Sequence, residues 1–311
     1  MIYGIGDKDG ENGDPGKIPE RLAKPLGKGF DEVECFLSEY LRPDRDEVNS
    51  TPDLGFSLGH VEKIDGIEQI LHGIDQNPEC LIEGCTSPTN GKALKEFLEK
   101  YKKSVEQVTA IDLIDIKGIF DKHKLDMPYT KFRVADATDL KEMYNDASVD
   151  VVAQDFLLNC APFSSQKPIM QEVARVLKPN GIGIICFTDN QCVMQREQVT
   201  VEQFEDRYKI KFKDDAFSVS DLLKKNGHTP EITREELLKE MTGKVVVDPA
   251  KNRYTLITEN GNFEFFQPFS SYQRLLDESG LKMVGQEISS GTDRNGLTCA
   301  RYRTIIKRGG D

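Results

Sequence analysis

The stretch "VDVVAQDFLLNCAPFSSQKPIMQEVARVLKPNGIGIICF", from Val149 to Phe187, decides the fold. Two nearly continuous apolar runs, at 149–158 and 181–189, flank a segment with helical spacing. That segment ends at Pro179-Asn180-Gly181, a turn through which a helix cannot continue. Long apolar runs that alternate with helices are typical of parallel strands buried on both faces of a sheet. We therefore predict an α/β fold, a three-layer doubly wound sheet.

The same alternation extends in both directions from this stretch. Upstream, the patterns predict strands at 80–84, 108–116 and 131–137 and a helix at 91–103. Downstream, "SSYQRLLDESG" predicts a helix closed by Gly280, and two further strands follow at 281–289 and 298–308.

The pattern divides the chain into four parts. Residues 1–29 are rich in Gly, Pro and charged residues and are predicted to be a mobile arm. Residues 30–79 are predicted to form a helical cap, with helices at 30–42 and 66–74. The sheet occupies 80–189 and 268–311. The polar segment 190–267 interrupts the alternation, and such long insertions are usually lids or binding regions.

Composition limits the partners. The formal net charge is -12 and no Lys/Arg-rich block offsets it, which argues against a nucleic-acid partner. No apolar run approaches the roughly 20 residues that cross a bilayer. The seven Cys are scattered without a C-x-x-C pair, and the four His show no metal-ligand spacing. We expect a cytoplasmic protein with reduced thiols, no membrane partner and no metal site.

Acidic or polar residues stand where successive predicted strands end. Glu83 with Gly84 ends the first strand, Asp112 and Asp136 lie in the next two, and Gln154 with Asp155 lies towards the end of the fourth. In an open parallel sheet, ligands bind beyond the carboxyl ends of the strands, where the strand order reverses. The ordered set therefore predicts a binding site at this edge.

The loop after the first strand is not suited to a dinucleotide. A dehydrogenase needs G-x-G-x-x-G there, so that the backbone can approach a pyrophosphate. Here Gly84-Cys85-Thr86 is followed by Ser87-Pro88-Thr89-Asn90. The G-x-G at Gly4 and Gly6 has no strand or helix pattern beside it. A dehydrogenase is therefore disfavoured.

Four stretches together resemble class I S-adenosylmethionine-dependent methyltransferases, in particular those that methylate small metabolites. They are "VTAIDLIDI" at 108–116, "FRVADATDL" at 132–140, "ASVDVVAQDFLLN" at 147–159 and "IMQEVARVLKPNGIGIICF" at 169–187. The resemblance covers about Cys80–Asp189 and Ser270–Lys307. It implies a Rossmann-like methyltransferase core that binds S-adenosylmethionine as cofactor.

The resemblance also implies roles for individual residues. Asp112 with Leu113 would hold the ribose, and Asp136 with Ala137 would face the adenine. Gln154, Asp155 and Phe156 would face the methionine part and the acceptor. The cofactor loop would be Glu83, Gly84, Cys85 and Thr86. This loop departs from the family pattern acidic-x-Gly-x-Gly-x-Gly, because Glu83 directly precedes Gly84 and the later glycines are absent.

The sequence leaves catalysis and the acceptor open. His60 and His72 are the candidates for a general base, although each is more often a structural residue. The aromatic residues of the insertion would line an acceptor pocket or form a core of their own: Tyr254, Phe263, Phe265, Phe266 and Phe269. We expect methyl transfer to an O, N or S atom of a small-molecule metabolite. Methylation of RNA or protein, and an inactive binding protein, remain alternatives. The oligomeric state stays open.

Overall fold

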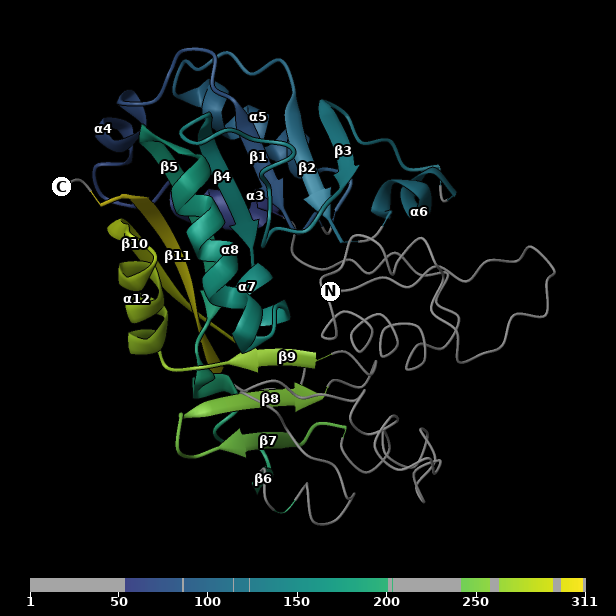
Figure 1. Ribbon diagram of the computed structural model, residues 1–311, viewed down its shortest axis with the longest axis vertical. Helices are drawn as coiled ribbons and strands as arrows, with labels where there is room; N and C mark the ends of the chain where they lie inside the picture. Colours follow the sequence, from purple (N-terminus) through teal and green to yellow (C-terminus); the bar gives the residue numbers. More distant parts are fainter. Residues whose placement is uncertain are drawn as a thin grey trace.

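The computed structural model describes residues 54–85, 87–113, 115–122, 124–200, 203, 242–257, 263–292 and 298–309 (Figure 1). The predicted arm at 1–29, the predicted helix at 30–42, Thr86 and most of the predicted insertion lie outside these residues.

A sheet of seven strands forms the centre of the fold, in the order β10-β11-β5-β4-β1-β2-β3. Strands β1 to β5 are parallel to one another, whereas β11 runs antiparallel to both β5 and β10. The doubly wound α/β sheet predicted from the sequence is thereby confirmed, and the antiparallel β11 makes it a mixed sheet. The strands are β1 Cys80–Glu83, β2 Val108–Asp112, β3 Thr130–Val134, β4 Val149–Asp155, β5 Leu177–Thr188, β10 Leu281–Thr292 and β11 Thr298–Arg308.

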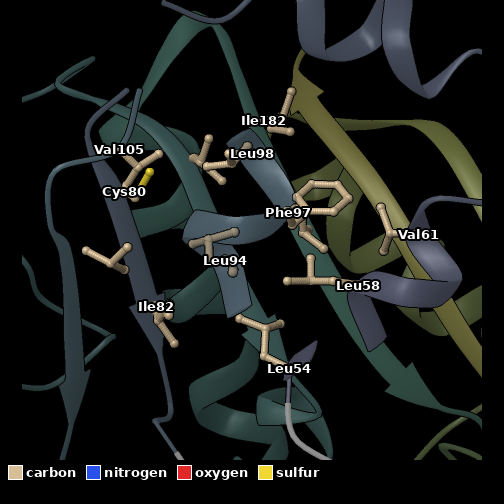
Figure 2. Packing of buried hydrophobic residues seen from close by; sticks show 14 of the residues in the cluster. Leu54, Leu58, Val61, Cys80, Ile82, Leu94, Phe97, Leu98, Val105 and Ile182 are labelled. Carbon is tan, nitrogen blue, oxygen red and sulfur yellow. The ribbon is translucent and has the colours of Figure 1, made fainter. Parts of the chain in front are cut away.

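Helices cover both faces of this sheet. One apolar core packs α3, α4 and α5 against one face, and a second packs α8 and α12 against the other. Figure 2 shows the first core, where Leu58 and Val61 of α3 lie beside Phe97 of α5. The helices are α3 Leu54–Val61, α4 Ile67–His72, α5 Asn90–Lys100, α6 Ile116–Lys122, α7 Leu157–Cys160, α8 Phe163–Val176 and α12 Phe269–Glu278.

The burial of β4 explains why its central residues, Val151 to Ala153, are apolar without alternation. Every residue of β4 is buried. Val151 and Ala153 contribute to the core beneath α3 and α5, and Val152 contributes to the core beneath α8 and α12. Successive side chains of a strand point to opposite faces, so a strand with two covered faces needs apolar residues at both.

Several predicted boundaries were wrong. The strand predicted at 108–116 ends at Asp112, and Ile116 already begins α6. The strand predicted at 149–158 ends at Asp155, because Phe156 has a φ of 58° and turns the chain into α7. The strand predicted at 131–137 likewise ends at Val134.

The helix predicted to end at Pro179-Asn180-Gly181 begins at Phe163 and already ends at Val176. It ends there because Leu177 is already extended and pairs with Val149 of β4. The helix that closes at Gly280 is as predicted, and Gly280 has the positive φ of 75° that favours glycine at such an end.

The insertion contains a second sheet, in the order β6-β7-β8-β9. Its strands are β6 Gln198–Thr200, β7 Val245–Asp248, β8 Arg253–Ile257 and β9 Phe263–Phe266. Tyr254 and Phe266 are buried with Val245, Val247 and Leu256, so these aromatic residues belong to a core of the insertion. Cys299 of β11 joins the same cluster, which ties the small sheet to the large one.

Two kinds of structure are absent from the described part of the chain. No helix there is long and apolar enough to cross a membrane. No group of three or more His, Cys, Asp or Glu side chains there could hold a metal ion.

Candidate cofactor and acceptor site

The carboxyl ends of β1, β2 and β4 meet at one edge of the sheet. β1 lies between β4 and β2, so the strand order reverses beside it. Glu83, at the end of β1, is the register partner of Gln154 in β4 and of Ile111 in β2. In Figure 1 the arrowheads of these strands point towards the side where β9 lies. This edge is where a doubly wound sheet binds its ligand.

Glu83 and Gln154 form a buried pair across β1 and β4. Nε2 of Gln154 donates to Oε2 of Glu83 at 2.5 Å, and both side chains are fully buried. Burial raises the pKa of Glu83 to about 8, while the hydrogen bond from Gln154 acts in the opposite direction. Oε1 of Glu83 and Oε1 of Gln154 have no hydrogen-bond partner among the described residues.

These two unpartnered atoms fit the cofactor that the resemblance implies. Oε1 of Gln154 is an acceptor, and Oε1 of Glu83 is one when the carboxyl is ionised, a form that a nearby cation favours. The methionine part of S-adenosylmethionine carries an ammonium group, which is a donor only. A buried polar atom without a partner costs about 1–3 kcal/mol, and a donor supplied by a ligand removes that cost. The end of β1 therefore has the chemistry to hold a cationic group.

The loop after β1 is shaped by its backbone and by short side chains. The main-chain N–H groups of Gly84 and Cys85 both donate to the oxygen of Ile111, at 3.0 and 3.3 Å. Gly84 has a φ of 74°, and a Cβ there would lie 3.1 Å from Cδ1 of Leu157. The hydroxyls of Ser87 and Thr89 lie 2.9 Å apart. Serine and threonine thus form the turn where the family pattern has glycines.

Cys85 contributes to this loop as a packed side chain. It is fully buried, and burial raises the pKa of its thiol to about 12. A thiol with so high a pKa is protonated at neutral pH and is a poor nucleophile.

The predicted ribose and adenine residues lie on adjacent loops. Asp112 is the last residue of β2 and is half-buried, and its main-chain oxygen accepts from the N–H of Ala135 at 2.9 Å. Leu113 follows it and is also half-buried. Oδ1 of Asp136 accepts from the N–H of Thr138 at 2.8 Å, which fixes the turn that also contains Ala137. The structure thus brings Asp112 and Asp136 to the same edge as Glu83.

Asp155 faces helix α3. Oγ of Ser57 donates to Oδ1 of Asp155 at 2.7 Å, and both side chains are buried. Phe156 follows in the left-handed conformation and leads into α7. The end of β4 is therefore closed on one side by α3, a helix in the part of the sequence that matched no family.

The two histidines lie at different places. Nδ1 of His60, on α3, lies 3.0 Å from Oε1 of Glu287 on β10. His72 is exposed at the end of α4. The next residue, Gly73, lies beside Lys307 near the end of β11. Lys178 forms ion pairs with both the nearby Asp75 and Asp150, which is at the start of β4. His72 is therefore at the amino ends of the strands, away from the other predicted site residues.

Sequence reasoning missed the polar residues between α3 and the sheet. These are Ser57, Glu287 and Arg303. Arg303 carried a usable signal, because it alternates with Ile305 on one face of a strand whose apolar residues are buried. A charged side chain in such a position is rarely buried without a reason.

Comparisons with known proteins agree with this arrangement. Residues 87–185 match the family model of the methyltransferase domain. None of the curated proteins compared with the chain matches it.

Similar solved structures include an S-adenosylmethionine-dependent methyltransferase from Methanosarcina mazei, at 18% identity and a TM-score of 0.44, over 77% of this chain and 96% of that one. A methyltransferase of the same description from Clostridium acetobutylicum has 12% identity and a TM-score of 0.45, over 84% and 94%. A putative sarcosine dimethylglycine methyltransferase from Galdieria sulphuraria has 12% identity and a TM-score of 0.43, over 82% and 86%.

The identities and TM-scores of these structures are too low to assign a family. The assignment of a methyltransferase domain therefore rests on the domain match, the strand order and the residues at the strand ends. The domain match spans α5 to β5 and so includes Asp112, Asp136 and Gln154, whereas β1 with Glu83 lies just before it. Residues 87–185 therefore match a methyltransferase domain, within a sheet of the doubly wound order expected from the sequence.

Proposed function

We propose that the protein transfers the methyl group of S-adenosylmethionine to an O, N or S atom of a small-molecule metabolite. The strongest support for a small acceptor is a contact between the sheet core and the insertion. The helix that follows β4 is hydrogen-bonded to the inserted sheet, because Nδ2 of Asn159 on α7 donates to the main-chain oxygen of Phe265 on β9 at 3.0 Å. The end of β4 thus lies between α3 and the inserted sheet, which favours an enclosed acceptor over a flat macromolecular surface.

In this proposal the strand ends hold the cofactor. Asp112 accepts from the ribose hydroxyls, Asp136 lies on the adenine side, and Glu83 with Gln154 faces the methionine ammonium. When bound, S-adenosylmethionine supplies a methyl group on a positively charged sulfur. The protein aligns this group with the acceptor atom and excludes water, and such positioning accounts for much of the rate of a displacement reaction.

The charge of the chain supports the same acceptor class. At a net charge of -12 the protein repels a phosphate backbone on average. We expect no nucleic-acid or membrane partner. We also expect a reducing compartment such as the cytoplasm, because five of the cysteines are free thiols, namely Cys80, Cys85, Cys160, Cys186 and Cys299.

The test follows a labelled methyl group. The protein is incubated with methyl-labelled S-adenosylmethionine and a cell extract, which is then separated into low-molecular-mass, RNA and protein fractions. We expect label in the low-molecular-mass fraction, and less of it with Asp112→Ala. Label in the RNA or protein fraction would instead support a macromolecular acceptor. Binding of the cofactor with no label anywhere would support an inactive binding protein.

A further inference from the structure

Arg303 is the largest side chain that is fully buried in the described part of the chain. It lies in the middle of β11, and its guanidinium stands 5.8 Å from the ring centroid of Phe56 on α3. Burial of a charge costs several kcal/mol unless partners satisfy it. The hydrogen-bond partners of the Arg303 guanidinium therefore indicate whether its role is structural or functional.

Only one of the three guanidinium nitrogens is satisfied. Nη1 donates to Oγ of Ser289, to the main-chain oxygen of Arg301 at 3.4 Å, and to Oε2 of Glu287 at 3.5 Å. Nε and Nη2 have no hydrogen-bond partner among the described residues, although both are buried. In a planar guanidinium, one N–H of Nη2 is parallel to the N–H of Nε, so the two form one edge with parallel donors. This free edge matches the two oxygens of a carboxylate.

The position of Arg303 connects it with the candidate site. Cys186 of β5 is the register partner of both Arg303 on β11 and Asp155 on β4. The three residues form one row across the sheet, close to the carboxyl ends of β4 and β5. Two strand spacings separate Asp155 from Arg303, which is about 10 Å. That span suits a small molecule with its methylated atom near the end of β4 and an acidic group at Arg303.

We propose that Arg303 binds the carboxylate of the methyl acceptor, so that the acceptor is a small carboxylic acid such as an amino acid. This inference rests on the proposed function, because it names the acceptor class of the same site. Asp155 stands at one end of the row and Glu287 contacts Arg303 at the other. These two carboxylates repel a doubly charged phosphate more strongly than a singly charged carboxylate. Phe56, packed over the guanidinium, and Ser289, hydrogen-bonded to Nη1, keep the free edge in place.

The test uses sodium acetate as the probe and S-adenosylhomocysteine to fill the cofactor site. Thermal unfolding of the full chain is measured at increasing acetate, with sodium chloride at equal ionic strength as the reference. Arg303→Met removes the guanidinium and keeps the length of the side chain. Arg308→Met is the matched control, because Arg308 lies on the same strand at the amino end of the sheet, where it donates to the main-chain oxygen of Leu177.

We expect acetate to raise the Tm of the wild type and of Arg308→Met. In Arg303→Met the apparent Kd for acetate should rise at least about tenfold, since the loss of a charged bidentate contact exceeds 1.4 kcal/mol. If Arg303→Met unfolds because Glu287 keeps only His60 as a partner, Arg303→Met with Glu287→Gln removes both charges and is measured in its place.

Three results would overturn the inference: no acetate effect in the wild type, equal effects in all variants, or stronger stabilisation by inorganic phosphate through Arg303. The proposed function is judged separately, by the binding of S-adenosylhomocysteine to the wild type. If that binding fails, the proposed function fails. If it succeeds while acetate has no Arg303-dependent effect, only the carboxylate inference fails.

Discussion

Gln154 donates a hydrogen bond to Glu83 between two neighbouring parallel strands, at a point where neither side chain reaches solvent. The pair joins residues that are 71 positions apart in the sequence. Among the described residues, Oε1 of each side chain has no hydrogen-bond partner. The ionisation of Glu83 should therefore influence both stability and cofactor binding.

Glu83→Gln should change how stability depends on pH. Burial raises the pKa of Glu83 from 4.5 to about 8. Between these values the folded chain keeps a proton that the unfolded chain has released. The free energy of unfolding should therefore fall as pH rises, by up to about 1.4 kcal/mol per pH unit, and level off above the folded pKa. Urea unfolding of both proteins across this range gives the difference, and parallel curves would contradict the assignment.

Asp112→Ala should weaken cofactor binding. If Asp112 accepts from the ribose hydroxyls, each charge-assisted hydrogen bond contributes about 1.5–3 kcal/mol, and the Kd for S-adenosylhomocysteine should rise at least about tenfold. Calorimetry measures this directly. The variant should remain folded, because the main-chain oxygen of Asp112, which binds the N–H of Ala135, is retained. An unchanged Kd in a folded variant would end the ribose assignment.

Asp136→Ala should weaken S-adenosylmethionine and S-adenosylhomocysteine by the same factor, because the adenosine part is common to both. Asp136 also accepts from the N–H of Thr138 and so shapes its own turn. Asp136→Asn keeps an oxygen for that bond and removes the charge, which separates the two roles. If only one of the two ligands loses affinity in titrations of both variants, Asp136 does not contact the adenine.

Asn159→Asp should loosen the contact between the core and the inserted sheet. Nδ2 of Asn159 donates to the main-chain oxygens of Thr188 and Phe265 and to the hydroxyl of Tyr272. A carboxylate oxygen in its place would face these oxygens without a hydrogen to donate. We expect the free energy of unfolding to fall by at least about 2 kcal/mol. Asn145→Asp, which adds the same charge at an exposed position, should be close to neutral in the same unfolding measurement, and equal losses would contradict the assigned role.

The order of helices and strands could be predicted because a strand that is buried on two faces has a short apolar run without alternation in its sequence. The central residues of β4, Val151, Val152 and Ala153, are apolar because both faces of the strand are covered, and the short length of this run between helices favours a strand over a buried helix. The strand ends were less predictable. Phe156 adopts a left-handed conformation that usually favours Gly or Asn, so nothing in its residue type indicates that β4 ends there.

The acceptor side of the site depends on contacts that no local pattern shows. Ser57 and Asp155, which hydrogen-bond beneath α3, are 98 positions apart. The sequence of the short helix that contains Ser57 shows no sign of this contact. Asp155 lies beneath Ser57 only because α3 packs on the sheet. The cofactor side could be predicted from the sequence, because its residues lie at the ends of strands or directly after them. The topology alone brings such positions together.

The place of β11 in the sheet has a consequence for biosynthesis. β11 pairs with β5, yet the whole inserted segment and β10 lie between them in the chain. During translation, the five parallel strands emerge first, and β5 then presents an open edge with apolar residues such as Ile184 and Ile185. Unpaired edges of this kind attract other chains. The nascent protein is thus vulnerable to aggregation until β11 has left the ribosome, and a variant that stops before β11 should depend on chaperones.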